Sequence, residues 1–205
     1  MKKKIIVALL ILIIAAGSAS AFNFMDYGAG IKGGDLMVNV AGTFGDSWTG
    51  LSFGAVAAID WALPLPLPLT VGLEAGALFL PKRYGNYEGM IAIPIIARIA
   101  WHFDLGISNF NLDPYILLKV GYALGFVTDP YPGYQYEMAS GIIYGFNIGA
   151  RWFFNDSFGI YLEAGYEYDT LSYRERYQYY SGWGSWYWRY HYTNRFATLG
   201  VTFKL

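Results

Sequence analysis

The chain has 205 residues, a formal net charge of −1 and no cysteine, which argues against a basic nucleic-acid-binding surface and against a disulfide framework. Aromatic residues make up 20% of the sequence but charged residues only 14%, against about 25% in soluble domains. So little charge cannot cover the surface of an ordinary soluble protein.

Residues 1–21 have the three parts of a secretory signal peptide. Lys2–Lys4 form a basic start, Ile5–Ala16 is an apolar run, and residues 19–21 read Ala-Ser-Ala, an A-x-A cleavage signal. A membrane anchor is the alternative, but the apolar run is shorter than the roughly 20 residues that a spanning helix needs. We predict a cleaved signal peptide, export through the secretory pathway, and a mature domain over residues 22–205.

After the signal peptide, segments that alternate between large apolar and small or polar side chains follow one another. Alternation with a period of two is typical of strands with two different faces. In 158–169, FGIYLEAGYEYD, one face is apolar and the other carries glycine, Tyr161 and acidic residues. The predicted strands cover residues 36–44, 53–63, 70–80, 91–103, 115–126, 144–154, 158–169 and 196–205. Each is near the 9 to 11 residues that a tilted strand needs to cross a bilayer.

The ionic side chains of these strands share the face opposite the large apolar side chains, and glycines crowd the same polar face. A soluble lipocalin-like barrel would place its apolar side chains inside instead. An open sheet is unstable in lipid, because each unpaired backbone amide or carbonyl at its edges costs several kcal/mol there. We therefore predict an all-β fold: an eight-stranded antiparallel transmembrane up-and-down β-barrel.

The connections between the predicted strands differ in length, and the two longest follow the fifth and seventh strands. Outer-membrane barrels have short periplasmic turns and longer extracellular loops. With both termini on the periplasmic side, the first, third, fifth and seventh connections are external. The sequence LPLPLP at 63–68 then lies at the periplasmic rim, where proline, which cannot donate to the ladder, ends the strand pairing.

The predicted inner face carries ionic side chains of both signs. They are Asp60, Glu74, Arg98, Lys119, Arg151, Glu163 and Glu167. We expect them to pair, because an unpaired buried charge has a heavy desolvation cost. Side chains just fill an eight-stranded barrel, so we predict a salt-bridged, largely plugged lumen. The alternative is a narrow or gated pore, because small inner residues could leave cavities. These are Gly72, Gly76, Gly121, Gly125, Gly145 and Gly149.

The segment 172–194, SYRERYQYYSGWGSWYWRYHYTN, is both aromatic and basic. If the last two strands continue above the membrane, it forms a hairpin that turns at Ser181–Ser185. Its aromatic face then leans over the barrel mouth, and its basic face meets anionic lipid headgroups. The residues predicted to make extracellular contacts are Arg174, Arg176, Trp183, Trp186, Trp188, Arg189 and His191. The alternative is an aromatic girdle that anchors the barrel at the membrane interface.

Catalytic motifs are weak. His191-Tyr192-Thr193 faintly matches the His-x-Ser pair of barrel lipid A deacylases, but no carboxylate follows it and threonine replaces serine. Glu163 and Glu167 share a face but lie about 13 Å apart at roughly 3.3 Å per residue, too far to act on one bond. The sequence has no Cys/His metal spacing and no phosphate-binding loop. We expect no enzyme activity, no cofactor and no bound metal.

Two segments resemble parts of the small eight-stranded outer-membrane β-barrels, of the OmpA-transmembrane-domain, OmpW and opacity-protein type. GARWFFNDSFGIYLEAGYEY contains a similar aromatic–Asn/Asp turn, and FATLGVTFKL resembles the terminal assembly signal, with Leu205 in place of the usual Phe. The resemblance covers roughly residues 30–205. It implies the outer membrane of a diderm bacterium and contact with the barrel insertion machinery.

These observations predict a structural and surface-interaction role through the extracellular loops. The expected partners are outer-membrane lipids, the insertion machinery, and a lipopolysaccharide-like lipid or a host surface ligand. We expect a monomer that does not bind nucleic acid. The alternative function is a narrow pore or an OmpW-like channel for small apolar molecules.

Overall fold

A computed structural model describes residues 26–28, 30–47, 50–81, 89–105, 111–128, 130–179 and 182–205. At residues 47, 50, 179, 182, 188 and 190–195 the backbone alone is described. The predicted signal peptide, residues 1–21, lies outside this part of the chain. No helix among the described residues is long and apolar enough to cross a membrane.

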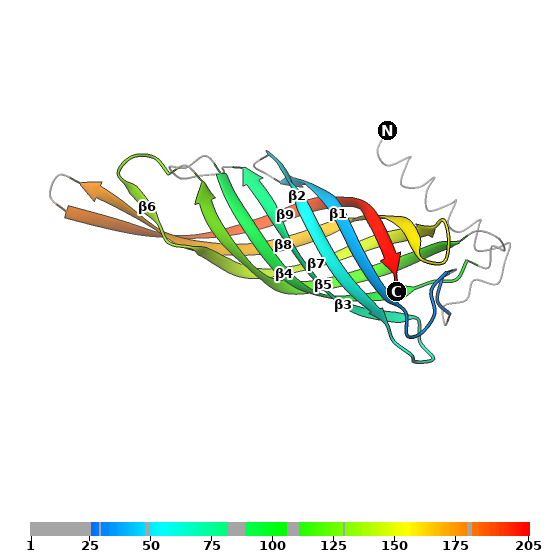
Figure 1. Ribbon diagram of the computed structural model, residues 1–205. Helices are drawn as coiled ribbons and strands as arrows, with labels where there is room; N and C mark the ends of the chain where they lie inside the picture. Colours follow the sequence, from blue (N-terminus) through cyan, green and yellow to red (C-terminus); the bar gives the residue numbers. More distant parts are fainter. Residues whose placement is uncertain are drawn as a thin grey trace, which may run out of the picture.

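The described chain folds into antiparallel strands that close into a barrel (Figure 1). The strands are β1 (Leu36–Ser47), β2 (Gly50–Ala62), β3 (Leu69–Pro81), β4 (Gly89–His102), β5 (Leu112–Thr128), β6 (Tyr134–Tyr136), β7 (Ala139–Phe153), β8 (Phe158–Tyr179) and β9 (Gly182–Lys204). The wall runs β1-β2-β3-β4-β5-β7-β8-β9, and β1 pairs with β9 to close it. The predicted eight-stranded up-and-down barrel is confirmed, with the short β6 as an addition.

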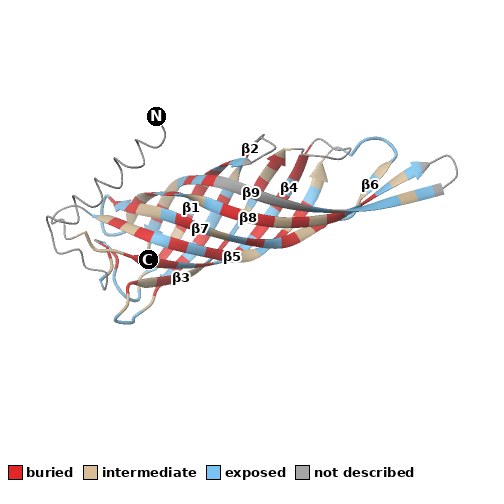
Figure 2. Ribbon diagram, turned by 180° about the vertical axis from the view of Figure 1, so that it is seen from behind, coloured by how far each residue is buried: buried red, intermediate tan, exposed pale blue. Residues whose placement is uncertain are grey.

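Side chains alternate between the interior and the outer surface along every strand of the wall (Figure 2). Arg98 and Glu163 point inward and are buried, whereas Leu118 and Ile148 point outward and are 56% and 54% exposed. Successive side chains of a strand point to opposite faces, so the period-two pattern of the sequence separates these two sets. The large apolar side chains of the predicted outer face are on the outside, as predicted.

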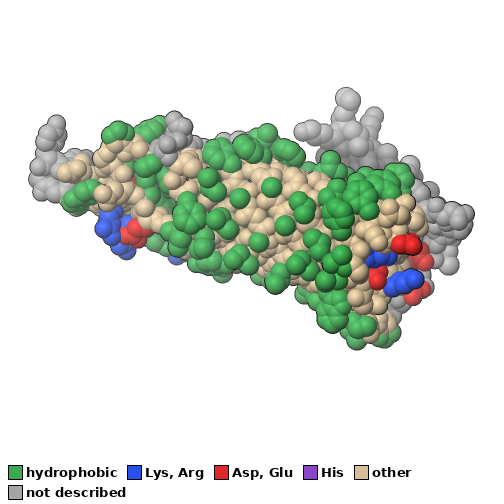
Figure 3. Space-filling model, in the orientation of Figure 1, with side chains coloured by type: hydrophobic (Ala, Val, Ile, Leu, Met, Phe, Trp, Pro, Cys, Tyr) green, Lys and Arg blue, Asp and Glu red, His purple; other side chains and the backbone are tan. Residues whose placement is uncertain are grey.

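The apolar outer surface forms a band around the barrel. On β8 the outward side chains from Phe158 to Tyr168 are apolar or aromatic, and they are followed by Thr170, Ser172 and Arg174. At about 3.3 Å per residue and a tilt of about 40°, this apolar stretch spans about 25 Å along the barrel axis, the height typical of outer-membrane barrels. Figure 3 shows hydrophobic side chains along the wall, with the charged side chains of this face gathered at its two ends.

β5 begins at Leu112 rather than at Tyr115, so the predicted boundary of the fifth strand is wrong. Pro114 does not end the strand, because its carbonyl accepts a hydrogen bond of 3.0 Å from the Phe103 amide. As a result Asp113, predicted to lie in the connection, points into the barrel and is fully buried.

A β-bulge joins β6 to β7. β6 pairs with β8 at Tyr136↔Glu175, and β7 pairs with β8 at Ser140↔Ser172. The β7 side therefore has one residue more than β8 between these two pairs, which defines a bulge. β6 lies within residues 128–140, a stretch predicted to be loop.

β8 and β9 form a hairpin that projects from the barrel, at the end opposite the C-terminus (Figure 1). They have 22 and 23 residues, against 12 to 17 in the other wall strands. Among the described residues, β9 pairs with β1 only from Arg195 onward, and before that only with β8. We call residues 174–187 the projecting hairpin.

The predicted turn of this hairpin at Ser181–Ser185 is wrong. Residues 182–185 belong to β9 and pair with β8, beginning with Gly182 opposite Tyr179, so they do not form the turn. Gly184 lies within β9 opposite Tyr177, and a Cβ at Gly184 would lie only 2.2 Å from the Tyr177 ring. An aromatic ring over a cross-strand glycine supports it within a strand, which explains why the glycine does not make the turn.

Candidate functional site

The interior of the barrel contains a continuous network of ion pairs, with Arg98 of β4 at its centre. Its guanidinium contacts Asp60 of β2 at 3.1 Å and Glu163 of β8 at 2.6 Å, and it also donates to Glu74 of β3. Arg98 is 2% exposed. Three strands from different parts of the wall are therefore joined through one side chain.

Lys119 of β5 extends the network toward the projecting hairpin. Its Nζ lies 3.1 Å from Glu74, 3.0 Å from Glu167 and 3.7 Å from Glu163. All four side chains are buried. Each carboxylate thus has a cation beside it, which offsets the cost of removing it from water.

Arg151 of β7 extends the network in the other direction. It contacts Asp60 at 2.6 Å and Asp113 at 3.6 Å, and its guanidinium lies 4.6 Å from the centre of the Tyr115 ring. The Tyr115 hydroxyl donates to Glu163 at 2.9 Å. The structure therefore brings all seven predicted inner residues into one cluster and adds Asp113 and Tyr115. Continuing the period-two pattern backward through Pro114 would have placed Asp113 on the inner face.

His102 links the end of this network to Thr70. Its Nδ1 lies 2.8 and 3.0 Å from the two Asp113 oxygens, and its Nε2 lies 3.0 Å from Thr70 Oγ1. Carboxylate, imidazole and hydroxyl occur in this order in acyl-transfer sites. Here all three side chains are buried, and the rings of Tyr27 and Tyr115 lie 5.7 and 5.4 Å from the imidazole. Because all three side chains are buried, the arrangement fits a structural role.

Glycines on the inner face mark close approaches between neighbouring groups. A Cβ at Gly72 would lie 2.2 Å from Asp60 Oδ1, and one at Gly149 would lie 2.4 Å from the Tyr115 ring. At Gly121 it would lie 2.2 Å from the Ile95 carbonyl oxygen. Neighbouring atoms therefore occupy the space beside these glycines. The described residues hold no group of three or more His, Cys, Asp or Glu that could bind a metal ion.

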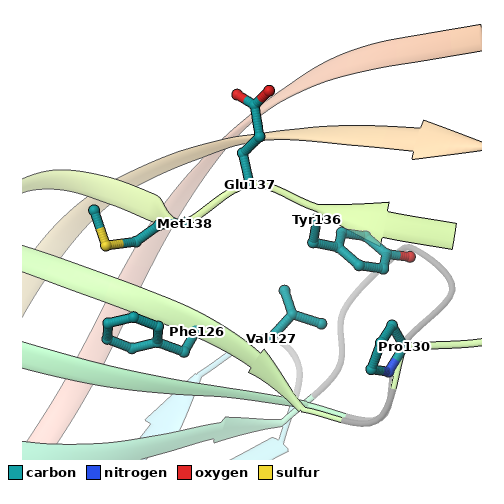
Figure 4. A pocket seen from close by; sticks show the side chains of 6 residues that line it. All are labelled: Phe126, Val127, Pro130, Tyr136, Glu137 and Met138. Carbon is teal, nitrogen blue, oxygen red and sulfur yellow. The ribbon is translucent and has the colours of Figure 1, made fainter.

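A cleft interrupts the wall between the upper ends of β5 and β6. β5 pairs with β7 as far as Gly125↔Ala139, and the described residues show no pairing between β5 and the bulged strand above that point. The cleft has a volume of about 200 Å³, and Figure 4 shows the Val127 side chain pointing into it from β5 while Glu137 points away. Its other lining residues are Phe126, Pro130, Tyr136 and Met138.

The residues that line this cleft belong to both surfaces of the wall. Phe126 and Met138 are exposed on the outside, whereas Val127 and Tyr136 pack against the apolar cluster inside the barrel. The cleft therefore lies where β5 and β6 are not paired, between outward-facing and inward-facing apolar side chains.

The predicted contact residues of the hairpin occupy different surroundings. Arg176 and Arg174 are exposed but contact Glu137, at 2.7 and 3.6 Å. Trp183 and Trp186 are 56% and 59% exposed, and Trp186 pairs with Glu175, a buried residue of β8. Arg189 is exposed on the outer face. The side chains of Trp188 and His191 lie outside the described part of the structure.

No protein-family model matches the sequence, and no curated protein matches it. Solved structures do. The outer membrane protein OprG from Pseudomonas aeruginosa is similar with a TM-score of 0.57 and 13% identity, over 87% of this chain and 98% of that chain. The chain has the fold of the small outer-membrane β-barrels.

Two further barrels show the same likeness. Neisserial surface protein A has a TM-score of 0.53 and 13% identity, over 85% of this chain and 98% of that chain. A major outer membrane protein from Thermus thermophilus has a TM-score of 0.53 and 12% identity, over 83% of this chain and 99% of that chain. At such identities the likeness concerns the fold, and the role of this barrel has to be argued from its own residues.

Proposed function

We propose that this barrel resides in the outer membrane of a diderm bacterium and presents the projecting hairpin as a surface-interaction element. The apolar band supports this location, because its height of about 25 Å matches that of outer-membrane barrels. The hairpin carries the functional part of the proposal. It extends beyond the other strands and exposes Trp183, Trp186 and Tyr187. Tyr and Trp provide rigid contact area at binding sites at little entropic cost.

The ion-pair network supports a barrel that acts as an anchor and has a closed lumen. Arg98, Lys119 and Arg151 each contact more than one carboxylate across the interior. Eight strands enclose just enough space for such side chains. The proposal assigns no reaction to the barrel, because the Asp113–His102–Thr70 arrangement is buried.

Removing the projecting hairpin tests this function. Tyr173 pairs with Trp188, so replacing residues 174–187 by Gly-Gly joins paired positions through a two-residue hairpin loop. We expect the variant to fold into a heat-modifiable barrel, since it loses no residue of the apolar band. Cells that display it should bind immobilised lipopolysaccharide and cultured epithelial cells less than cells that display the full chain.

The double variant Trp183→Ser, Trp186→Ser is a second test, because it removes the exposed rings but keeps the strands. It should lose binding to a similar extent. Undiminished binding by the folded deletion variant would exclude the hairpin as the interaction element.

The cleft between β5 and β6 favours a second candidate function, the passage of small apolar molecules through the wall. Val127→Phe would fill the cleft and should slow the uptake of a small alkane by cells that display the barrel. Val120→Phe is the matched control, because Val120 faces outward on the same strand and is exposed away from the cleft. Equal uptake by both variants would exclude the cleft as a route.

A further inference from the structure

A polar groove crosses the outer wall beneath the projecting hairpin. It has a volume of about 440 Å³ and lies over the neighbouring strands β5, β7, β8 and β9. Its lining residues include Tyr122, Ser140, Ile142, Ser172, Tyr187 and Arg189. The groove faces the surroundings of the barrel and not its interior.

The groove lies at the external edge of the apolar band. Tyr122 and Ile142 belong to the band, are exposed and pair with each other across β5 and β7. Ser172 follows Tyr168 and Thr170 on the outer face of β8, and it pairs with Arg189 of β9. One end of the groove is therefore apolar and the other is cationic and hydroxylic.

A break in the β7–β8 ladder forms the floor of the groove. Strand pairing is interrupted between Ser140↔Ser172 and Ile143↔Asp169. In the gap, the Thr170 hydroxyl accepts from the Ile142 amide at 3.0 Å and donates to the Ile142 carbonyl at 3.2 Å. A Cβ at Gly141 would lie 1.3 Å from the Thr170 carbonyl oxygen, so the close approach of the two strands requires glycine there.

The cationic end of the groove favours negative charge on oxygen. Hydrogen bonds with Ser172 and then with Arg189 lower the pKa of the exposed Tyr187 hydroxyl, and the charges of Arg189 and Arg174 act in the same direction. Arg174 and Arg176 are held by Glu137, whereas Arg189 has the Tyr187 hydroxyl as its partner. An anionic ligand can displace the neutral Tyr187 hydroxyl from Arg189 more readily than it can displace the Glu137 carboxylate from Arg174 and Arg176.

We propose that this groove binds an outer-leaflet lipid that carries a phosphate monoester, with Arg189 at the phosphate and Tyr122 and Ile142 at the acyl chain. Arginine can bind phosphate through two parallel hydrogen bonds. The apolar end lies where the acyl chain of such a lipid begins. This inference rests on the proposed outer-membrane location, and it names a lipid partner for the base of the hairpin.

Lipid retention tests the proposal. The full barrel is reconstituted in nanodiscs of phosphatidylcholine with a minor fraction of phosphatidic acid, and the retained lipids are counted by native mass spectrometry. We expect phosphatidic acid to be enriched on the barrel, and Arg189→Gln to lower this enrichment about tenfold, the effect of losing a charge-assisted hydrogen bond. Arg176→Gln, an exposed arginine of the same hairpin, is the matched control and should retain the lipid.

Two further arms separate the alternatives. Inorganic phosphate should not displace the lipid, because it lacks the acyl chain; displacement would mean a site for free anions and would overturn the proposal. Equal enrichment in Arg189→Gln and Arg176→Gln would also overturn it. Should Arg189→Gln not give a heat-modifiable barrel, Arg189→Lys, which keeps the charge but not the paired hydrogen bonds, should show an intermediate loss.

Different outcomes would overturn the lipid-binding role of the groove and the interaction role of the projecting hairpin. Loss of surface binding on removal of residues 174–187, with phosphatidic acid retention unaffected by Arg189→Gln, would overturn the groove alone. Retention that depends on Arg189, with surface binding unaffected by the deletion, would overturn the hairpin's role alone.

Discussion

Arg98 is the residue on which the interior depends most, because it contacts carboxylates from three other strands. Replacing such a side chain together with its partners changes the stability of the fold little. Removing it alone destabilises the fold strongly. The carboxylates then stay buried without their counter-charge, which is the costly arrangement.

We predict that Arg98→Met lowers the free energy of unfolding by about 3 to 5 kcal/mol. Denaturant unfolding of the barrel in micelles measures this change. Arg176→Met is the matched control, because the exposed Arg176–Glu137 pair should contribute at most about 1 kcal/mol. Equal stability of the two variants would show that the interior ion pairs do not hold the strands together.

A charge introduced on the outer face of the wall tests whether that face contacts lipid. Leu118 points away from the barrel on β5 and is 56% exposed. In lipid, Leu118→Arg should cost about 2 to 4 kcal/mol near the bilayer midplane. Leu118→Ala changes the size of the side chain without adding charge and serves as the control. Folding into lipid vesicles, followed by denaturant titration, measures both.

An effect of Leu118→Arg within about 0.5 kcal/mol would be normal for the surface of a soluble protein. Such a result would contradict the membrane-facing assignment of the outer surface.

At the scale of the elements, the contact between β7 and β8 explains why the wall has a groove and still closes. The strands approach so closely at Gly141 that the ladder is replaced by bonds of the Thr170 hydroxyl. The carbonyl of Thr170 belongs to the backbone, so it cannot move aside as the end of a side chain could.

We predict that Gly141→Ala separates β7 from β8 and destabilises the barrel by several kcal/mol, in the range of severe steric changes. Gly42→Ala is the matched control, because the nearest atom to a Cβ there is 3.8 Å away. That substitution should be neutral or stabilise by about 0.5 to 1 kcal/mol, since alanine loses less freedom in a strand. Hydrogen exchange of the Ile142 amide should rise in Gly141→Ala and stay unchanged in Gly42→Ala.

For the whole molecule, ion pairs run through the barrel from Asp113 to Glu167. Under the proposed function this network closes the lumen and the barrel acts as an anchor, whereas a pore would need these side chains to separate. The cleft between β5 and β6 lies in the wall, so the second candidate function would not require the lumen to open.

We predict that the purified barrel shows little or no steady conductance in planar bilayers. An ion that crossed the lumen would have to pass Arg98 and the carboxylates that surround it. Heat-modifiable migration of the same preparation checks that the barrel is folded. A stable open state in most insertions would contradict the closed lumen and favour the pore.

Local sequence patterns were enough to predict the eight strands of the wall, their two faces and the closure of the barrel, because side-chain direction in a strand alternates with a period of two and needs only local information. It also placed Asp60, Arg98 and Glu163 on one inner face. Pairing within that set could be predicted, because buried charges of opposite sign stabilise each other.

Other features of the barrel could not be predicted from these patterns. Cross-strand register kept residues 182–185 within β9, with Tyr177 over Gly184. β5 continues through Pro114 because the Pro114 carbonyl still accepts a hydrogen bond from the Phe103 amide. As a result Asp113 lies beside His102. The cleft and the outer groove arise where neighbouring strands lose their pairing. Such features depend on contacts between residues far apart in the chain, which a local pattern does not contain.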